Sequence, residues 1–192
     1  MATLSDYVTM EDLADYMDAD TLPESMGQLS LSAAQQIVRQ YTGQDITYAE
    51  SVEVRDGRGT SVMRLKQRPV YEVTAVTLND EDITDFVQDG ALVKLTVGSF
   101  TKGVGNVEIE YTHGWAVPAE VDSDGIDPVP ADIILVTLSV AARYLRGMDE
   151  DTTMKSETIG QYSYARDTTL AVGDLLTAEL AVLERYTVRL IP

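Results

Sequence analysis

The spacing of hydrophobic and polar residues divides the chain into helical and alternating regions. Apolar residues recur at helical spacing behind Thr9, which predicts a short helix over residues 9–18. A second helix is expected over 32–42, where Ser32 and Gln35 form a capping box and Gly43 ends the run. Between residues 50 and 115 the pattern alternates in about five strand-like segments separated by polar turns. Because no helix interrupts them, these segments predict an antiparallel β-subdomain.

The most apolar segment follows this alternating region. From Ile133 to Ala142 only Thr137 and Ser139 are polar, and Pro130 suits the first turn of a helix. A helix over 130–146 that is apolar on nearly every side must be covered on nearly every side, and it is too short to span a bilayer. We therefore expect it at the centre of the core.

The last helical pattern covers residues 173–187 and has two neighbouring apolar stripes. The tail over 186–192 is also apolar, although chain termini are usually polar. One subunit's core rarely needs so wide an apolar face, so a partner surface is expected here. The predicted fold class is α+β: a helical bundle with an inserted antiparallel β-subdomain of about five strands over 50–115, in a single domain of 192 residues.

The formal net charge of the chain is -18. No Lys or Arg precedes Arg39, and none lies between Lys102 and Arg143. Such a surface repels phosphate, which disfavours ordinary nucleic-acid binding. Two interpretations stay open: a plainly acidic soluble protein, or a surface that does not adhere to DNA lying close by. The absence of cysteine excludes disulfides and thiolate chemistry, and the first residues do not form a signal peptide.

No candidate for catalysis or metal binding emerges from the sequence. His113 is the only histidine, and no nucleophile and acid accompany it in a catalytic pattern, so a structural role is favoured. The acidic loop with Asp122, Asp124 and Asp127 lacks the ligand spacing of an EF-hand and is interpreted as solvated. We expect no enzyme, no cofactor and no metal.

Two groups of residues are candidates for contacts between proteins. Tyr162 and Tyr164 alternate onto one side of an extended segment, where they pack on the chain's own sheet or on a partner. Arg55 and Arg58 belong to the main basic cluster, which lies on exposed strand faces or pairs with the acidic surface of a neighbouring subunit. Both alternatives stay open for each group.

Several short motifs, in order along most of the chain, resemble the head–tail connector (adaptor) proteins of long-tailed bacteriophages. They are Thr9–Leu13, Ala33–Gly43, Leu65–Val76, Val107–Trp115 and Val129–Asp132 with the helix that follows, together with Ser156–Tyr164. Their order and spacing carry the resemblance, because each motif is short. The long acidic loop Glu120–Asp127 departs from the family pattern.

The resemblance implies a structural protein of the virion, assembled in the host cytoplasm, without enzymatic activity and without a membrane. It implies a twelve-fold ring beneath the portal protein that extends the DNA channel and receives stopper or tail-completion proteins, while double-stranded DNA passes without specific binding. The residues expected to dock onto the portal are Leu183, Arg185, Tyr186, Val188, Arg189, Leu190 and Ile191. Asp122, Asp124 and Asp127 are suggested as acids that face the channel.

The strong negative charge also permits a different class of function. An acidic protein can mimic DNA and occupy the nucleic-acid site of a host protein. The apolar last helix and tail are not needed for that role.

Overall fold

The computed structural model describes the backbone of residues 6–117, 125–149, 156–159, 162–165 and 175–188, and the side chains of these except 149, 156–159 and 162–165. The chain divides into two compact units. The helical unit comprises Val8–Tyr41 and Pro130–Tyr186, and the β unit comprises Thr42–Val129 with Met1–Tyr7 and Thr187–Pro192. The α+β class and the β-subdomain inserted between helices are confirmed.

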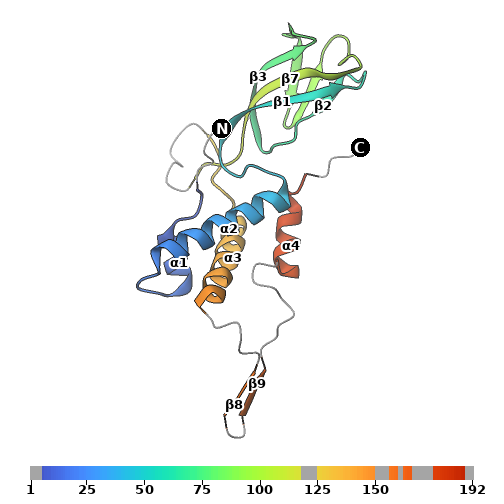
Figure 1. Cartoon of the computed structure of the whole chain (residues 1–192). Coiled ribbons are helices and arrows are strands. Elements are labelled where there is room, and N and C mark those ends of the chain that lie inside the picture. The colour runs from blue at the N-terminus through green and yellow to red at the C-terminus, as the bar shows by residue number, and fades with distance from the viewer. Residues whose placement is uncertain (1–5, 118–124, 150–155, 160–161, 166–174, 189–192) are drawn as a thin grey trace. The chain divides into compact units, whose positions relative to one another are not determined.

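The helical unit contains α1 (Met10–Met17), α2 (Glu24–Thr42, whose last residue belongs to the β unit), α3 (Ala131–Asp149) and α4 (Thr177–Leu183), followed by a 3-10 turn, η2 (Glu184–Tyr186). Helix α3 contacts both α1 and α4 (Figure 1). A capping box begins α1 behind Thr9, because the Asp12 amide donates to Thr9 Oγ1 at 3.2 Å and the Thr9 amide donates to Asp12 Oδ2 at 2.7 Å.

Helix α3 is the core helix expected from its composition. Eight of its residues are buried: Ile133, Val136, Thr137, Leu138, Val140, Ala141, Ala142 and Leu145. Thr137 satisfies its hydroxyl inside this apolar surrounding by donating to the Ile133 carbonyl at 2.8 Å. Within the apolar segment from Ile133 to Ala142, Leu135 is exposed.

Helix α2 begins eight residues earlier than the predicted helix over 32–42. Pro23 directly precedes the helix, where a proline costs little, and its carbonyl accepts from the Gly27 amide at 2.8 Å. Gly27 lies inside α2, and a Cβ there would come within 2.5 Å of Met10 Cε. The glycine therefore leaves room for the Met10 side chain of α1. The predicted start at Ser32 was wrong.

Seven strands in two antiparallel sheets form the β unit, where about five were predicted (Figure 1). The larger sheet has the order β1 (Ala49–Gly57), β7 (Gly103–His113), β3 (Val70–Leu78) and β4 (Glu81–Asp82). The smaller sheet has the order β2 (Val62–Arg64), β6 (Leu92–Leu95) and β5 (Phe86–Asp89).

The two sheets enclose one core between them. It combines inward side chains of both sheets with Phe100 from a loop: Met63, Leu65, Val73, Val76, Val93, Leu95, Phe100, Val107, Ile109 and Tyr111. Because residues of both sheets share this cluster, the sheets pack face to face. Their other faces consequently point away from each other.

A separate hairpin is formed by β8 (Ser156–Ile159) and β9 (Tyr162–Ala165), in which Glu157 is paired with Tyr164. The sequence predicted one extended segment here. Among the described residues, no helix is long and apolar enough to cross a membrane.

Candidate assembly surfaces

An ion pair buried between helices holds α4 in the helical unit. Glu179 on α4 is 7% exposed, and its carboxylate accepts from both terminal nitrogens of Arg143 on α3, at 2.6 and 2.8 Å. Burial alone would raise the pKa of Glu179, but hydrogen bonds from Arg143, the Leu176 amide and Ser139 outweigh it and lower the pKa. The hydrogen bond with Glu179 raises the pKa of Arg143. The pair is therefore charged on both sides.

A second group of contacts lies at the start of α3, where Asp132 binds the end of the helical unit. Arg185 donates to Asp132 Oδ2 at 2.8 Å, and the Tyr186 hydroxyl donates to Asp132 Oδ1 at 2.8 Å. Burial and the Asp132 carboxylate raise the pKa of Tyr186 to about 12. The Arg185 side chain keeps 62% of its surface exposed, so this pair lies at the rim of the unit.

The residues predicted to dock onto a portal fall into three groups. Leu183 is fully buried in the helical unit, so this residue packs in the chain's own core and is left out of the docking segment below. Arg185 and Tyr186 both bind Asp132 at the rim of the helical unit, where Arg185 is exposed and Tyr186 is half-buried, and the Val188 amide donates to the Thr42 carbonyl at 3.4 Å. Arg189, Leu190 and Ile191 lie outside the described residues.

The outward face of the larger sheet carries valines and acids and is called the acidic sheet face. Strand register places its residues in three rows across β1, β7 and β3. These rows are Glu50–Thr112–Glu72, Val52–Glu110–Ala75 and Val54–Glu108–Thr77. Val52 and Val54 are 56% and 57% exposed.

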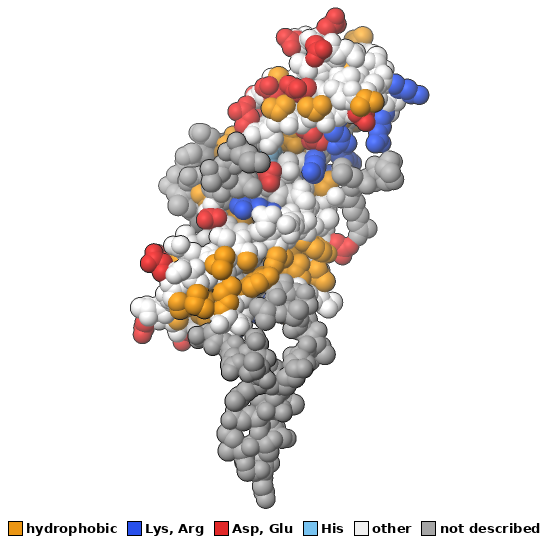
Figure 2. Space-filling model, viewed as in Figure 1, with side chains coloured by type: hydrophobic (Ala, Val, Ile, Leu, Met, Phe, Trp, Pro, Cys, Tyr) orange, Lys and Arg blue, Asp and Glu red, His pale blue; other side chains and the backbone are white. Residues whose placement is uncertain are grey.

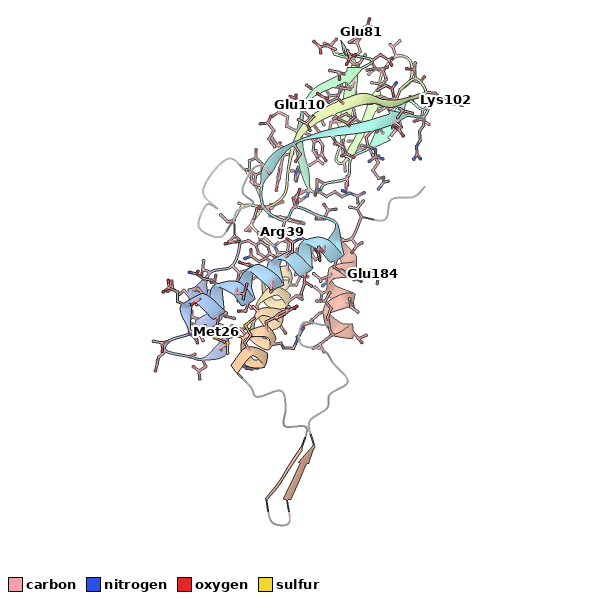
Figure 3. The ribbon with its side chains drawn as sticks, in the orientation of Figure 1. Met26, Arg39, Glu81, Lys102, Glu110 and Glu184 are labelled. Carbon is pink, nitrogen blue, oxygen red and sulfur yellow. The ribbon has the colours of Figure 1, made fainter. Side chains whose placement is uncertain are left out.

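The outward face of the smaller sheet is called the basic sheet face. Its two rows across β2, β6 and β5 are Val62–Lys94–Val87 and Arg64–Leu92–Asp89. Val62 and Val87 are 40% and 53% exposed. Figure 2 shows Asp and Glu gathered on one side of the β unit and Lys and Arg on another, and Figure 3 places Glu110 and Lys102 on opposite sides.

The inward face of β1 is polar, which reverses the usual arrangement of a strand. Arg55 donates to Glu53 Oε1 at 2.5 Å, and Glu53 Oε2 accepts from the Tyr111 hydroxyl at 2.8 Å and from the Lys66 amide at 3.0 Å. Burial is the main reason that the pKa of Tyr111 is raised. Arg55 thus has a partner within its own chain, whereas Arg58 is exposed.

Three solved structures contain chains with a fold similar to that of this chain. The chain matches a chain of the "Neck of empty GTA particle computed with C6 symmetry" at TM-score 0.61 and 18% identity, over 100% of this chain and 95% of that chain. It matches the "Neck of native GTA particle computed with C12 symmetry" at TM-score 0.59 and 18% identity, with the same coverage. A third match is the "Virion of native gene transfer agent (GTA) particle", at TM-score 0.59 and 18% identity, over 96% and 92% of the two chains.

This chain has the fold of a gene transfer agent neck protein. No family model and no curated protein matches it. The fold expected from the connector resemblance is therefore confirmed along the whole chain, through both units.

His113 lies in this neck fold as a buried residue of β7, with its Nε2 2.8 Å from Ser51 Oγ. The distance suits a hydroxyl activated by a base, but His113 Nδ1 has no hydrogen-bond partner among the described residues, so no acid orients the ring. Burial lowers the pKa of His113, against the opposing charges of Asp45 and Glu53. The arrangement supports a neutral, structural histidine.

The remaining candidates are only partly described. Asp127 is exposed, and its amide donates to the Tyr71 hydroxyl at 3.1 Å, whereas Asp122 and Asp124 lie outside the described residues. The side chains of Tyr162 and Tyr164 also lie outside them. Within the described part of the chain, no group of three or more His, Cys, Asp or Glu side chains could hold a metal ion.

Sequence reasoning missed both sheet faces. Alternation in β1 was visible, but the rows that join Val54 to Glu108 and Val87 to Lys94 depend on strand register. A signal was present in the sequence, since the basic cluster that contains Arg55 and Arg58 continues to Arg64, Lys66 and Arg68. Lys94, which completes the basic sheet face, lies 30 residues along the chain (94 − 64).

Proposed function

We propose that this protein is a structural component of a virion, located in the neck where the head of a phage-like particle joins its tail. The observation that carries the proposal is the fold match over 100% of the chain and 95% of a neck protein, a coverage that includes the β unit and the helical unit. Physical features agree with a structural role: the described sites offer assembly surfaces, and His113 has no orienting acid.

The proposed assembly is a ring of identical subunits, twelve in number. The matched neck structures were computed with C12 and C6 symmetry, and cyclic symmetry is common among homo-oligomers. A twelve-fold ring would carry 12 × -18 = -216 formal charges. Such a ring repels phosphate, so double-stranded DNA would pass along its channel without adhering.

The proposed portal contact is the C-terminal segment, comprising Arg185, Tyr186, Val188, Arg189, Leu190 and Ile191. Arg185 pairs with Asp132 but keeps most of its side chain exposed, so it can also meet acidic groups of a portal. The segment after Tyr186 is apolar, and an apolar tail needs a surface that covers it. On the other side of the ring, a stopper or tail-completion protein would bind, where Tyr162, Tyr164 and Arg58 are candidate contacts.

The decisive experiment mixes the purified chain with the portal protein of its particle and measures native mass and negative-stain images. We expect rings bound to the portal. A variant that ends at Tyr186 should keep the circular dichroism of the full chain and lose portal binding, because it retains every helix and strand that the structure describes. Unchanged binding by this variant would contradict the docking proposal.

The acidic loop can be tested separately from docking. If Asp122, Asp124 and Asp127 face the channel, changing all three to Lys should slow genome ejection, because lysines bind phosphate. Changing Asp80, Glu81 and Asp82, which lie in the turn after β3 and in β4, to Lys serves as a control with the same change of charge. An ejection rate that is the same in both variants would exclude the loop from the channel wall.

A further inference from the structure

The two outward sheet faces of the β unit are complementary in character. The acidic sheet face has Glu50, Glu72, Glu108 and Glu110, and none of its nine residues is basic. The basic sheet face has Arg64 and Lys94, with Asp89 at one corner. On both faces a central charge has apolar neighbours: Lys94 lies between Val62 and Val87, and Glu110 lies between Val52 and Ala75.

Exposed valines in these rows are left uncovered by the described residues. Four of them, Val52, Val54, Val62 and Val87, are 40–57% exposed on regular strands, two on each face. Scattered apolar residues are normal on a surface. These four, however, lie beside opposite charges on two faces of one small unit, so packing one face on the other would bury the valines and pair the charges together.

The geometry of a ring requires such a pair of different faces. In a cyclic ring of three or more subunits the contacts that close the ring are head-to-tail, so each subunit needs two distinct surfaces that fit each other. Neighbours in a twelve-fold ring are related by a rotation of about 30° (360°/12), so the two surfaces must point in nearly opposite directions. The outward faces of two sheets that enclose one core meet this condition.

We infer that the acidic sheet face of one subunit binds the basic sheet face of the next copy of this chain. The inference rests on the proposed ring and assigns the surfaces that build it. Val54 and Glu108 of one copy then lie against Val87 and Lys94 of its neighbour. Arg64 provides a second positive charge opposite the acids.

Disulfide cross-linking tests this directly, because the natural chain has no cysteine. The double variant Val54→Cys/Val87→Cys, oxidised at high concentration, should give a ladder of covalent oligomers on a denaturing gel. Each single variant should stay monomeric, and a mixture of the two single variants should stop at covalent dimers. This pattern is specific to a head-to-tail contact, since in an isologous contact the double variant would stop at dimers closed by two disulfides.

A matched control separates contact from random collision. The variant Leu29→Cys/Val87→Cys carries two thiols at positions of similar exposure, 59% and 53%, but Leu29 is on α2 in the helical unit. It should give no ladder. An equal ladder from this control, or no ladder from Val54→Cys/Val87→Cys, would overturn the face assignment.

Charge exchange provides a second readout that needs no thiol. Glu108→Lys/Glu110→Lys and Arg64→Glu/Lys94→Glu should each raise the concentration needed for assembly on the order of tenfold, and the two together in one chain should restore it. If the wild type forms rings and these variants form them equally well, the assignment of the two sheet faces as the contact is wrong, while the proposed ring is unaffected. If the wild type forms no oligomer even with its portal, the proposed function itself fails.

Discussion

The two units of this protein differ in where their charged side chains lie. In the helical unit, charged groups of distant segments meet inside the unit, as Arg143 and Glu179 do. In the β unit, Glu53 and Arg55 also pair inside, but exposed valines remain outside, beside the charges of two sheet faces. The comparison indicates that the helical unit pairs these charges internally, whereas the β unit leaves charges of opposite sign beside exposed valines on two outward faces.

The largest expected effect follows from breaking the ion pair of the helical unit. Arg143→Met leaves the Glu179 carboxylate 7% exposed and without its cation, so we expect a loss of about 3 kcal/mol in the free energy of unfolding. The loss should appear in urea titrations followed by circular dichroism, whose signal the helices dominate. Trp115, the only tryptophan of the chain, reports the β unit separately by fluorescence.

A double variant distinguishes loss of the pair from loss of packing. Arg143→Met/Glu179→Leu replaces the pair by apolar side chains and should recover most of the stability, because no buried charge is then left alone. If the double variant is as unstable as Arg143→Met, the side chains stabilise α4 through packing. The ion pair would then not be what stabilises the helical unit.

The ion pair also shows what the sequence could and could not predict. Composition alone was sufficient for α3, since a segment with only small polar residues must be covered wherever it lies. Arg143 and Glu179 are separated by 36 residues, and no local pattern brings them together. Conversely, Val52 and Val54 alternate as a buried face would, yet they are exposed, because Glu53 finds Tyr111 and Arg55 on the inner side. Pattern predicts that a strand exists, whereas partners from other strands decide which face it buries.

The next effect concerns the polar interior of the β unit. Tyr111→Phe removes the hydroxyl that donates to Glu53 at 2.8 Å and accepts from the Gln67 amide at 3.3 Å, while the ring keeps its place in the core. A hydrogen bond to a charged group is strong, so we expect a loss of about 2 kcal/mol, measured by Trp115 fluorescence in urea. Tyr71→Phe, which removes one neutral bond to the Asp127 amide, should cost about half as much. Equal losses would show that the Glu53 charge is of no importance.

The two units should also respond to acid in different pH ranges. The pKa of His113 is lower in the folded β unit than in the unfolded chain, where it is about 6.5. Between these two pKa values, His113 is protonated in the unfolded chain and neutral in the folded one. The stability of the β unit therefore falls as the pH drops below about 6.5, by less than about 1.4 kcal/mol per pH unit. Glu179 has a lowered pKa in the helical unit, so its contribution is complete above about 4.5 and is lost as the pH falls further.

Urea titrations at a series of pH values check this order. As the pH falls, the free energy of unfolding reported by Trp115 fluorescence should decrease first. The free energy of unfolding reported by circular dichroism of the helices should decrease at lower pH. His113→Gln should remove the early loss in the β unit, although Asp45 and Glu53, the acids whose charges act on His113, remain. If both signals fall together near pH 4 in the wild type, the histidine has no separate effect.

The smallest effect concerns the second ion pair of the helical unit. Arg185 reaches Asp132 at 2.8 Å, but its side chain is 62% exposed, so Arg185→Met should lower the free energy of unfolding by less than about 1 kcal/mol. The contrast with Arg143→Met separates two roles of arginine in the helical unit. Arg143 holds α4 inside the unit, whereas Arg185 lies at its rim beside the proposed portal-docking tail. Arg185→Met should therefore weaken portal binding more than it weakens the fold, and Arg185→Lys should restore part of that binding. A loss of stability as large as that of Arg143→Met would instead make Arg185 a structural residue and remove it from the docking segment.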